Sequence, residues 1–333
     1  MSGQGGGMGL KVRGLTATFD TPRGVARAVE GVDLDIAPGE VVGLVGESGS
    51  GKSVTLRSIL RLVREPGRVT GSVEWNGRDL MAMGARELRR VRGAEIAMIF
   101  QEPMTALNPV LPVGLQIEEN LRAHTGMAAA ARRARALELM DVVGIPAAAR
   151  RLEEYPHQFS GGMRQRVMIA IALASSPKLL LADEPTTALD VTIQDQILKL
   201  ILDLRDRFGM SVLFVTHDLG VVAATCDRMA VMYAGRIVET GTVPAVFAGP
   251  HHPYTRGLLG SVPRAGSERS MLLSIDGTPP SLTAIPAGCA FNPRCTFATD
   301  ACRAELPALE AFAPGRKVAC FHHARVAAMS EAA

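Results

Sequence analysis

Aromatic side chains are scarce in this 333-residue chain, and the net charge is close to zero. Phe, Trp and Tyr make up 4% of the residues, which leaves few rings for stacking on a single-stranded nucleic acid. The 36 Lys and Arg residues against 33 Asp and Glu give a formal charge of +3. That balance is too even for charge alone to indicate nucleic-acid binding. We therefore expect no nucleic-acid partner.

Long apolar runs are also missing. A membrane-spanning helix needs about eighteen apolar residues, and the longest candidate, Val167–Ala174, is far shorter. The opening residues, MSGQGGGMGL, have no basic region followed by an apolar core, so we expect no signal peptide and treat residues 1–9 as a flexible leader. The chain is expected to be cytoplasmic and to reach a membrane only through a partner.

Hydrophobic residues (47%) outweigh charged ones (21%), which excludes extensive disorder. Residues 40–45, 178–182 and 211–216 are apolar runs typical of buried parallel strands. An amphipathic helix is predicted over 191–208, and another over 52–63 that Pro66 ends. Strand, helix and strand in this order predict an α/β fold with a mainly parallel sheet.

Composition divides the chain further. Residues 10–250 are predicted to form the sheet domain, which begins with short strands and carries an inserted helical subdomain at about 102–176. From residue 251 to 333, Pro, Gly and Cys become more frequent and periodicity fades, so we expect a separate C-terminal extension.

A phosphate-binding loop follows the first buried run. The sequence fits G-x-x-x-x-G-K-[ST], between a predicted strand and a predicted helix. Backbone N–H groups of such a loop surround phosphate oxygens, Lys52 neutralises the β- and γ-phosphates, and Ser53 can bind Mg²⁺. The residues of this predicted ATP site are Gly46, Glu47, Ser48, Gly49, Ser50, Gly51, Lys52 and Ser53.

Two carboxylates follow the second buried run. Asp183 ends the run LLLAD, at the sheet edge where parallel α/β folds bind ligands, and can hold Mg²⁺. Glu184 is placed to activate a water for attack on the γ-phosphate.

A second anion site is predicted at Ser160, which can cap a helix whose first residues are glycines. One nucleotide cannot easily use two such separated loops. A dimer resolves this, with each segment at Ser160 contacting ATP held by the other subunit.

With Gln101 and His217, the order of these motifs resembles that of ABC-transporter ATPases. The resemblance implies that Gln101 senses the γ-phosphate, contacts Mg²⁺ and touches a membrane subunit, and that His217 contacts the γ-phosphate. Gln101 and His217 are therefore expected to be catalytic together with Glu184. The resemblance also implies that Phe19 stacks on adenine, although aromatic residues near strand ends usually belong to the core. The signature segment facing the partner's ATP is Ser160, Gly161, Gly162 and Met163, and Asp190 belongs to the D-loop within Ala188-Leu189-Asp190.

The signature departs from the general pattern, with Phe159 in place of Leu and Met163 in place of Gln. This variant, together with FQEPMTALNP and HHPYTRGLL, is similar to the ATPase subunits of dipeptide and oligopeptide importers. That resemblance implies an antiparallel N-terminal β subdomain and a peripheral place on the cytoplasmic face of the membrane. It also implies as partners a second ATPase, expected to be a paralogue, two transmembrane permeases and an extracytoplasmic binding protein. Nickel and glutathione importers share these motifs, so the solute stays open.

Four cysteines, spaced C-x5-C-x6-C-x17-C, lie in the extension. A cytoplasmic chain seldom uses such thiols as disulfides, so they suggest a metal centre. Spacing alone leaves zinc, iron–sulfur and inert buried thiols open, whereas the resemblance favours a [4Fe–4S] cluster. The ligands would be Cys289, Cys295, Cys302 and Cys320.

A soluble nucleic-acid ATPase is the main alternative function. Such proteins carry long coiled-coil or DNA-binding insertions, and the insert here is only about seventy residues. A scaffold that only shares the fold is a third possibility, but it would need neither Glu184 nor His217.

Overall fold

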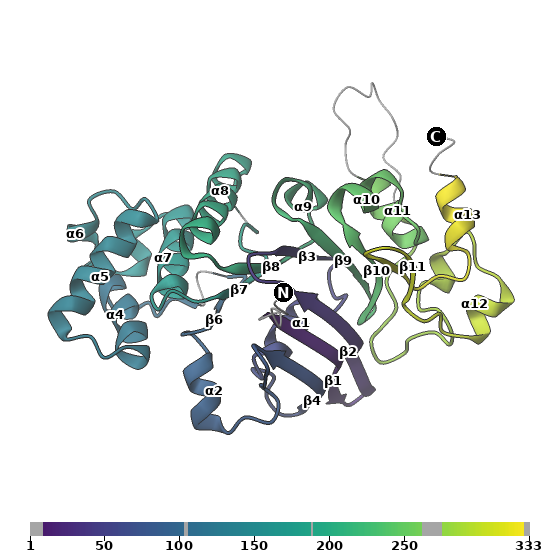
Figure 1. Cartoon of the computed structure of the whole chain (residues 1–333), viewed down its shortest axis with the longest axis horizontal. Coiled ribbons are helices and arrows are strands. Elements are labelled where there is room, and N and C mark those ends of the chain that lie inside the picture. The colour runs from purple at the N-terminus through teal and green to yellow at the C-terminus, as the bar shows by residue number, and fades with distance from the viewer. Residues whose placement is uncertain (1–8, 103–105, 188, 262–274, 330–333) are drawn as a thin grey trace, which may run out of the picture. The chain divides into compact units, whose positions relative to one another are not determined.

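The computed structural model describes residues 9–102, 106–187, 189–261 and 275–329. The chain divides into two compact units (Figure 1). The first comprises Met1–Ile36, Val41–Met81 and Val215–Ala333, and the second Ala37–Glu40 and Ala82–Phe214. The residues after 250 thus fall in the same compact unit as the predicted phosphate loop, whereas the boundaries expected at 102, 176 and 250 remain predictions.

The first unit contains an antiparallel sheet in the order β2-β1-β4-β5. Its strands are β1 (Leu10–Thr21), β2 (Gly24–Ile36), β4 (Gly67–Trp75) and β5 (Arg78–Asp79). Alternation of buried and exposed side chains along β1 and β2 leaves one face for the core, as expected of an antiparallel sheet.

A second set of strands in this unit has the order β11-β12-β10-β9-β3. β3 (Val41–Val45), buried at every position, pairs in parallel with β9 (Arg228–Tyr233). The remaining strands are antiparallel: β10 (Arg236–Thr242), β12 (Arg316–Val318) and β11 (Glu310–Ala313).

Short helices complete the first unit (Figure 1). They are α1 (Lys52–Ile59), α9 (Leu219–Thr225), α10 (Val243–Ala248), α11 (Pro253–Gly260), the 3₁₀ turn η2 (Asn292–Arg294), α12 (Asp300–Ala304) and α13 (His323–Ala328). The prediction that the helix after the loop reaches residue 63 was wrong. The helix ends at Ile59, because Arg61 takes a left-handed conformation (φ 51°) before Pro66 is reached.

The second unit is mainly helical. Its strands follow the order β8-β7-β6, where β6 (Ile96–Ile99) and β7 (Leu179–Asp183) are parallel and β8 is Ser211–Thr216. The last two residues of β8, Val215 and Thr216, are assigned to the first unit. The helices are α2 (Ala85–Val91), α4 (Val113–His124), α5 (Ala129–Val142), α6 (Ala148–Arg151), η1 (Pro156–Gln158), α7 (Gly161–Leu173) and α8 (Val191–Phe208). The bounds predicted for α8 and β8 are confirmed, and every residue of β7 and β8 is buried, as their apolar sequences indicated.

The C-terminal segment shares a core with the strands of the first unit. Tyr233 at the end of β9, Tyr254 on α11 and Phe291 before η2 belong to one cluster of buried residues. Their rings pack in pairs, with centroid separations of 4.6 to 5.5 Å. This aromatic cluster joins the segment after residue 250 to the strand that runs beside β3.

Candidate functional site

The predicted phosphate loop connects β3 to α1, and two of its glycines are required by close backbone neighbours. A Cβ at Gly46 would lie 2.2 Å from the Met232 carbonyl oxygen. At Gly51, φ is +107° and a Cβ would lie 2.2 Å from the Ala28 carbonyl oxygen. Neither position has room for a side chain, so the loop takes this path only with glycine there.

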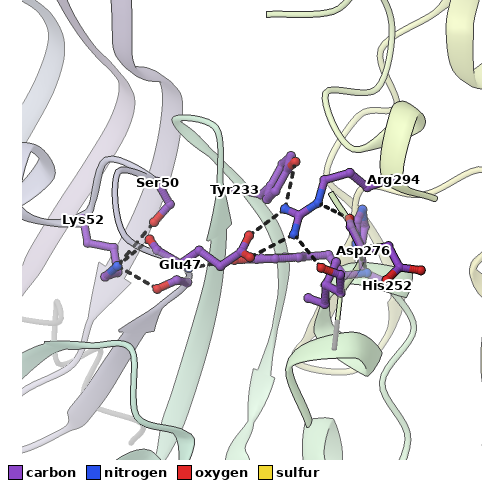
Figure 2. A network of polar contacts seen from close by, with 10 residues as sticks. Glu47, Ser50, Lys52, Tyr233, His252, Asp276 and Arg294 are labelled. Carbon is purple, nitrogen blue, oxygen red and sulfur yellow. Dashed lines mark hydrogen bonds and ion pairs between the residues drawn. The ribbon is translucent and has the colours of Figure 1, made fainter. Parts of the chain in front are cut away.

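The Lys52 side chain folds back onto the phosphate loop. Its side chain is 4% exposed, and Nζ donates to the carbonyl oxygens of Gly46 (2.7 Å) and Glu47 (2.9 Å) (Figure 2). The ammonium group is therefore held among loop atoms at the N-terminus of α1, where partial positive charge from the helix also favours an anion. Ser53 follows in the first turn of the same helix.

Glu47 connects the loop to the C-terminal segment. Its backbone N–H donates to the Tyr254 hydroxyl at 2.7 Å. Its carboxylate accepts two hydrogen bonds from Arg294, Nη1 to Oε2 at 2.7 Å and Nη2 to Oε1 at 3.0 Å (Figure 2). The sequence analysis placed Glu47 in the loop but missed both partners.

The Arg294 guanidinium is enclosed. Nε donates to the Asp276 carbonyl oxygen at 2.9 Å, and the group lies 5.8 Å from the centres of both the Tyr233 and Phe291 rings. Pairing with Glu47 raises the pKa of Arg294 still further, so it stays charged. Burial raises the pKa of Tyr254, whose hydroxyl therefore stays protonated and can accept from Glu47.

In the second unit, the structure brings Gln101 and Glu184 together. Asp183 is the last residue of β7 and fully buried, and Glu184 follows in a left-handed conformation (φ 45°). Oε2 of Glu184 accepts from Gln101 Nε2 at 3.3 Å and from the Thr187 hydroxyl at 2.7 Å. Two side chains thus orient the carboxylate that was predicted to act as base, and Thr187 is a contact that the sequence analysis missed.

The predicted signature and D-loop residues cap two helices. Ser160 caps α7, its Oγ accepting from the Met163 N–H at 3.4 Å, and Gly161 and Gly162 form the first turn. Asp190 caps α8 through Oδ1, which accepts from Ile193 N–H at 3.0 Å. Ser160 was predicted as a cap and is one; Ala188 of the D-loop sequence lies outside the described residues.

Phe19 and His217 belong to the first unit. Phe19 lies on β1 opposite Ala26 and Gly67, and a Cβ at Gly67 would come 2.7 Å from its ring. His217 is exposed just after β8. Their roles toward adenine and the γ-phosphate remain predictions.

The four cysteines of the extension line one pocket. Cys302 is buried, and Cys289, Cys295 and Cys320 are half-buried. Burial raises the pKa of these three half-buried thiols, to about 12 for Cys320, and the neighbouring cysteines raise each further. None of the described cysteines forms a disulfide.

In the part of the chain that the structure describes, no group of three or more His, Cys, Asp or Glu side chains has an arrangement that could hold a metal ion. The four thiols therefore converge on one pocket without forming a metal-binding geometry there.

Comparison with known proteins decides the family. The model of the "ABC transporter" family matches residues 29–187, and that of the "Oligopeptide/dipeptide transporter, C-terminal region" matches 238–302. The oligopeptide transport ATP-binding protein OppD of Salmonella typhimurium is 50% identical over 94% of this chain and 93% of its own length. The chain belongs to the ATP-binding proteins of ABC transporters. The dipeptide transport ATP-binding protein DppD of Escherichia coli is also 50% identical, over 94% of this chain and 96% of that protein.

Solved structures agree with this ABC ATPase fold. The dimeric ATP-binding cassette MJ0796, in a post-hydrolysis state with ADP and Pi, aligns with a TM-score of 0.64 at 32% identity, over 70% of this chain and 98% of that one. CbiO1 of Clostridium perfringens aligns with a TM-score of 0.61 at 26% identity, over 72% of this chain and 90% of that one. Among the described residues, no helix combines the length and hydrophobicity that a membrane span requires.

Proposed function

We propose that this ABC ATPase hydrolyses ATP to power the import of dipeptides or oligopeptides across the cytoplasmic membrane. The observation that carries the proposal is the match over nearly the whole chain, extension included, to transport ATP-binding proteins named for these two solute classes. The structure supports it with a glycine-dependent loop that encloses Lys52 and with an oriented carboxylate at Glu184.

The proposed ATP site uses the predicted residues. Lys52 and the loop N–H groups bind the phosphates, and Mg²⁺ is held by Ser53, Gln101 and Asp183. Glu184 accepts the proton of the attacking water, since Gln101 and Thr187 hold its carboxylate in place. His217 contacts the γ-phosphate and Phe19 the adenine. The signature residues, Ser160, Gly161, Gly162 and Met163, and Asp190 of the D-loop serve ATP bound by the partner ATPase.

The proposed partners are a second ATPase, two permeases and an extracytoplasmic binding protein, with this chain on the cytoplasmic face of the membrane. Large side chains around the Gln101 segment support a permease contact. Val110 is 74% exposed, and Phe100 and Leu115 are also exposed. Contact between these apolar groups and water is unfavourable. A protein surface that covers them therefore lowers the free energy of the complex.

We also propose that the extension holds a [4Fe–4S] cluster, with zinc as the alternative. The chemistry of the donor set fits, since four thiols from separate segments line one pocket and none of the described cysteines is in a disulfide. Cluster binding would have to draw the four sulfur atoms together, because the described residues hold no metal-binding arrangement without it. The raised pKa values of Cys289, Cys295 and Cys320 favour neutral thiols at these three positions in the metal-free chain, so metal binding there must displace protons. When bound, the cluster would supply a structural cross-link among Cys289, Cys295, Cys302 and Cys320.

Transport by the assembled complex tests the main proposal. The chain is reconstituted in vesicles with the permease and ATPase subunits that co-purify with it and with their binding protein, and uptake of labelled dipeptides, longer peptides, nickel and glutathione is measured. We expect ATP-dependent peptide uptake that stops with Glu184→Gln. Uptake of nickel or glutathione alone would replace peptide with that solute, and the absence of ATP-dependent uptake of any of them would refute the importer assignment.

A further inference from the structure

Two residues of the C-terminal segment, Tyr254 and Arg294, form hydrogen bonds with the same residue of the phosphate loop, Glu47. The Tyr254 hydroxyl accepts a hydrogen bond from the backbone N–H of Glu47. Arg294 binds both oxygens of the Glu47 carboxylate (Figure 2). One contact fixes the main chain and the other fixes the side chain. The conformation of Glu47 therefore depends on residues that lie some two hundred positions later in the sequence.

The Arg294 guanidinium is held in a fixed position by several contacts. Besides Glu47, its guanidinium donates to the carbonyl oxygens of Ile275 (3.2 Å) and Asp276 (2.9 Å), and its side chain is 5% exposed. The Tyr233 hydroxyl lies 3.4 Å from Nη1. Because its N–H donors point to fixed acceptors on several sides, the planar guanidinium has one orientation. An arginine on the surface would instead be free to turn.

The charge of this pair bears on phosphate binding. The carbonyl oxygen of Glu47 already accepts from Lys52 Nζ at 2.9 Å, so Glu47 belongs to the group of atoms that positions the lysine. An uncompensated carboxylate in the loop would repel a polyphosphate, and at 28% exposure water would screen it only in part. Arg294 cancels that charge and holds the carboxylate turned toward itself.

We propose that Arg294 is a positioning residue for the nucleotide-binding loop, through which the C-terminal segment sets the affinity for ATP. This inference rests on the proposed role of residues 46–53 in binding ATP. Arg294 acts through Glu47 and contacts no nucleotide in the proposal. It also lies between Cys289 and Cys295, in η2, so a rearrangement of that segment would reach the loop through the same ion pair.

Nucleotide affinity of the full chain tests this. Dissociation constants for Mg-ATP are measured by calorimetry for wild type, Arg294→Gln, Glu47→Gln, the double variant and Arg294→Lys. We expect Arg294→Gln to weaken binding about tenfold, because the carboxylate is left unneutralised beside the phosphates. On the Glu47→Gln background, Arg294→Gln should change the dissociation constant by less than about twofold, because the side chain through which Arg294 acts has already been altered.

Three further measurements separate positioning from simple structural support. Arg294→Lys keeps the charge without the two-pronged geometry and should fall between wild type and Arg294→Gln. The loss in Arg294→Gln should shrink as salt rises from about 0.05 M to about 0.5 M, since the effect is electrostatic. Arg303→Gln, which removes an exposed arginine paired with Asp300 on α12, is the matched control and should bind like wild type.

The proposal is overturned if Arg294→Gln binds Mg-ATP as wild type does. It is equally overturned if the same loss appears whether residue 47 is Glu or Gln, because Arg294 would then act without Glu47. Should Arg294→Gln fail to fold, Arg294→Lys and the double variant still decide between these outcomes. A wild-type chain that binds no Mg-ATP would instead refute the proposed ATP site, which keeps the two failures distinct.

Discussion

The backbone N–H of Glu47 donates to the Tyr254 hydroxyl at 2.7 Å, which ties the phosphate loop to α11, the helix that begins at Pro253. Tyr254 has no exposed surface, so water cannot replace it as the acceptor without rearrangement. The backbone N–H of Glu47 is therefore already used in a hydrogen bond within the protein. The His-Pro-Tyr sequence of α11 has a local reason: His252 caps the helix, Pro253 starts it, and Tyr254 contacts the loop.

Removing this hydroxyl should destabilise the first unit. We expect Tyr254→Phe to lower the free energy of unfolding by about 1–3 kcal/mol, because the Glu47 N–H loses its acceptor in a buried place. Urea unfolding followed by fluorescence measures it, since the chain's one tryptophan, Trp75, is buried in this unit. Tyr233→Phe is the matched control: among the described residues its hydroxyl has a long 3.4 Å contact with Arg294, so the loss of stability should be smaller. Equal losses would contradict the assigned hydrogen bond.

Binding and hydrolysis of ATP should separate in two variants. Lys52→Ala should abolish nucleotide binding, because it removes the main positive charge facing the phosphates. Glu184→Gln should retain binding but slow hydrolysis by about 10²-fold or more, the usual effect of losing a general base. Single-site turnover in the assembled complex is the measurement, since a different partner ATPase could mask the loss. Unchanged turnover in Glu184→Gln would remove Glu184 from the role of base.

The signature segment should act on the partner's nucleotide. We expect Ser160→Arg to block hydrolysis at the partner's site while ATP binding by the isolated chain stays nearly unchanged. Ser160→Arg removes the cap of α7 and also adds a large side chain. Ser160→Ala is the control, because it removes only the cap, at a cost of about 1 kcal/mol of stability. If Ser160→Arg weakened ATP binding in the isolated chain, the site shared between two chains would be contradicted.

Sequence patterns located the elements that depend on local chemistry. The buried strands at 179–183 and 211–216 and the helix Val191–Phe208 follow from apolar runs and a 3.6-residue period. The loop at Gly46 was located from its glycine pattern, whereas the carbonyl oxygens of Met232 and Ala28 that exclude side chains there are visible only in the structure. The end of α1 was misjudged because Pro66 was taken as the stop, whereas the backbone turns at Arg61.

Contacts between distant segments were out of reach of sequence patterns. Arg294 was visible in CAFNPRC and Tyr254 in HHPYTRGLL, yet nothing in either sequence says that both meet Glu47. Their meeting depends on the packing of Tyr233, Tyr254 and Phe291 in one core. For the same reason, the sequence indicated a possible site from four cysteines but not that all four line one pocket.

Anaerobic purification tests the cysteine pocket. We expect brown protein with about four iron and four sulfide per chain, the content of a [4Fe–4S] cluster. Cys295→Ser should lose the colour and make the segment after residue 275 more sensitive to protease, while ATP binding survives. Cys226→Ser is the control, because this thiol lies at the end of α9 and does not line the pocket. Stoichiometric zinc without iron would exclude the cluster and keep a metal site, and the absence of any metal would mean that the four thiols have no metal-binding role.

Acid should act on the first unit through His252. This ring is fully buried, and burial lowers its pKa from 6.5 to about 3. Below pH 6.5 the unfolded chain binds a proton that the folded chain refuses, so the histidine's contribution to stability falls as the pH falls, down to about pH 3. From pH 7 to pH 5 the loss should be about 2 kcal/mol.

Comparison with His252→Asn isolates this effect from other titrating groups, including Glu239, whose carboxylate accepts the His252 backbone N–H and whose pKa burial raises. Asparagine does not titrate and can still cap α11, where His252 Nδ1 now accepts from the Tyr254 N–H at 3.1 Å. Urea unfolding at each pH, followed by Trp75 fluorescence, gives the difference between the two proteins. We expect the stability advantage of wild type over His252→Asn to shrink by about 2 kcal/mol between pH 7 and pH 5. A difference that does not change with pH would mean that His252 takes up its proton equally in the folded and unfolded chain.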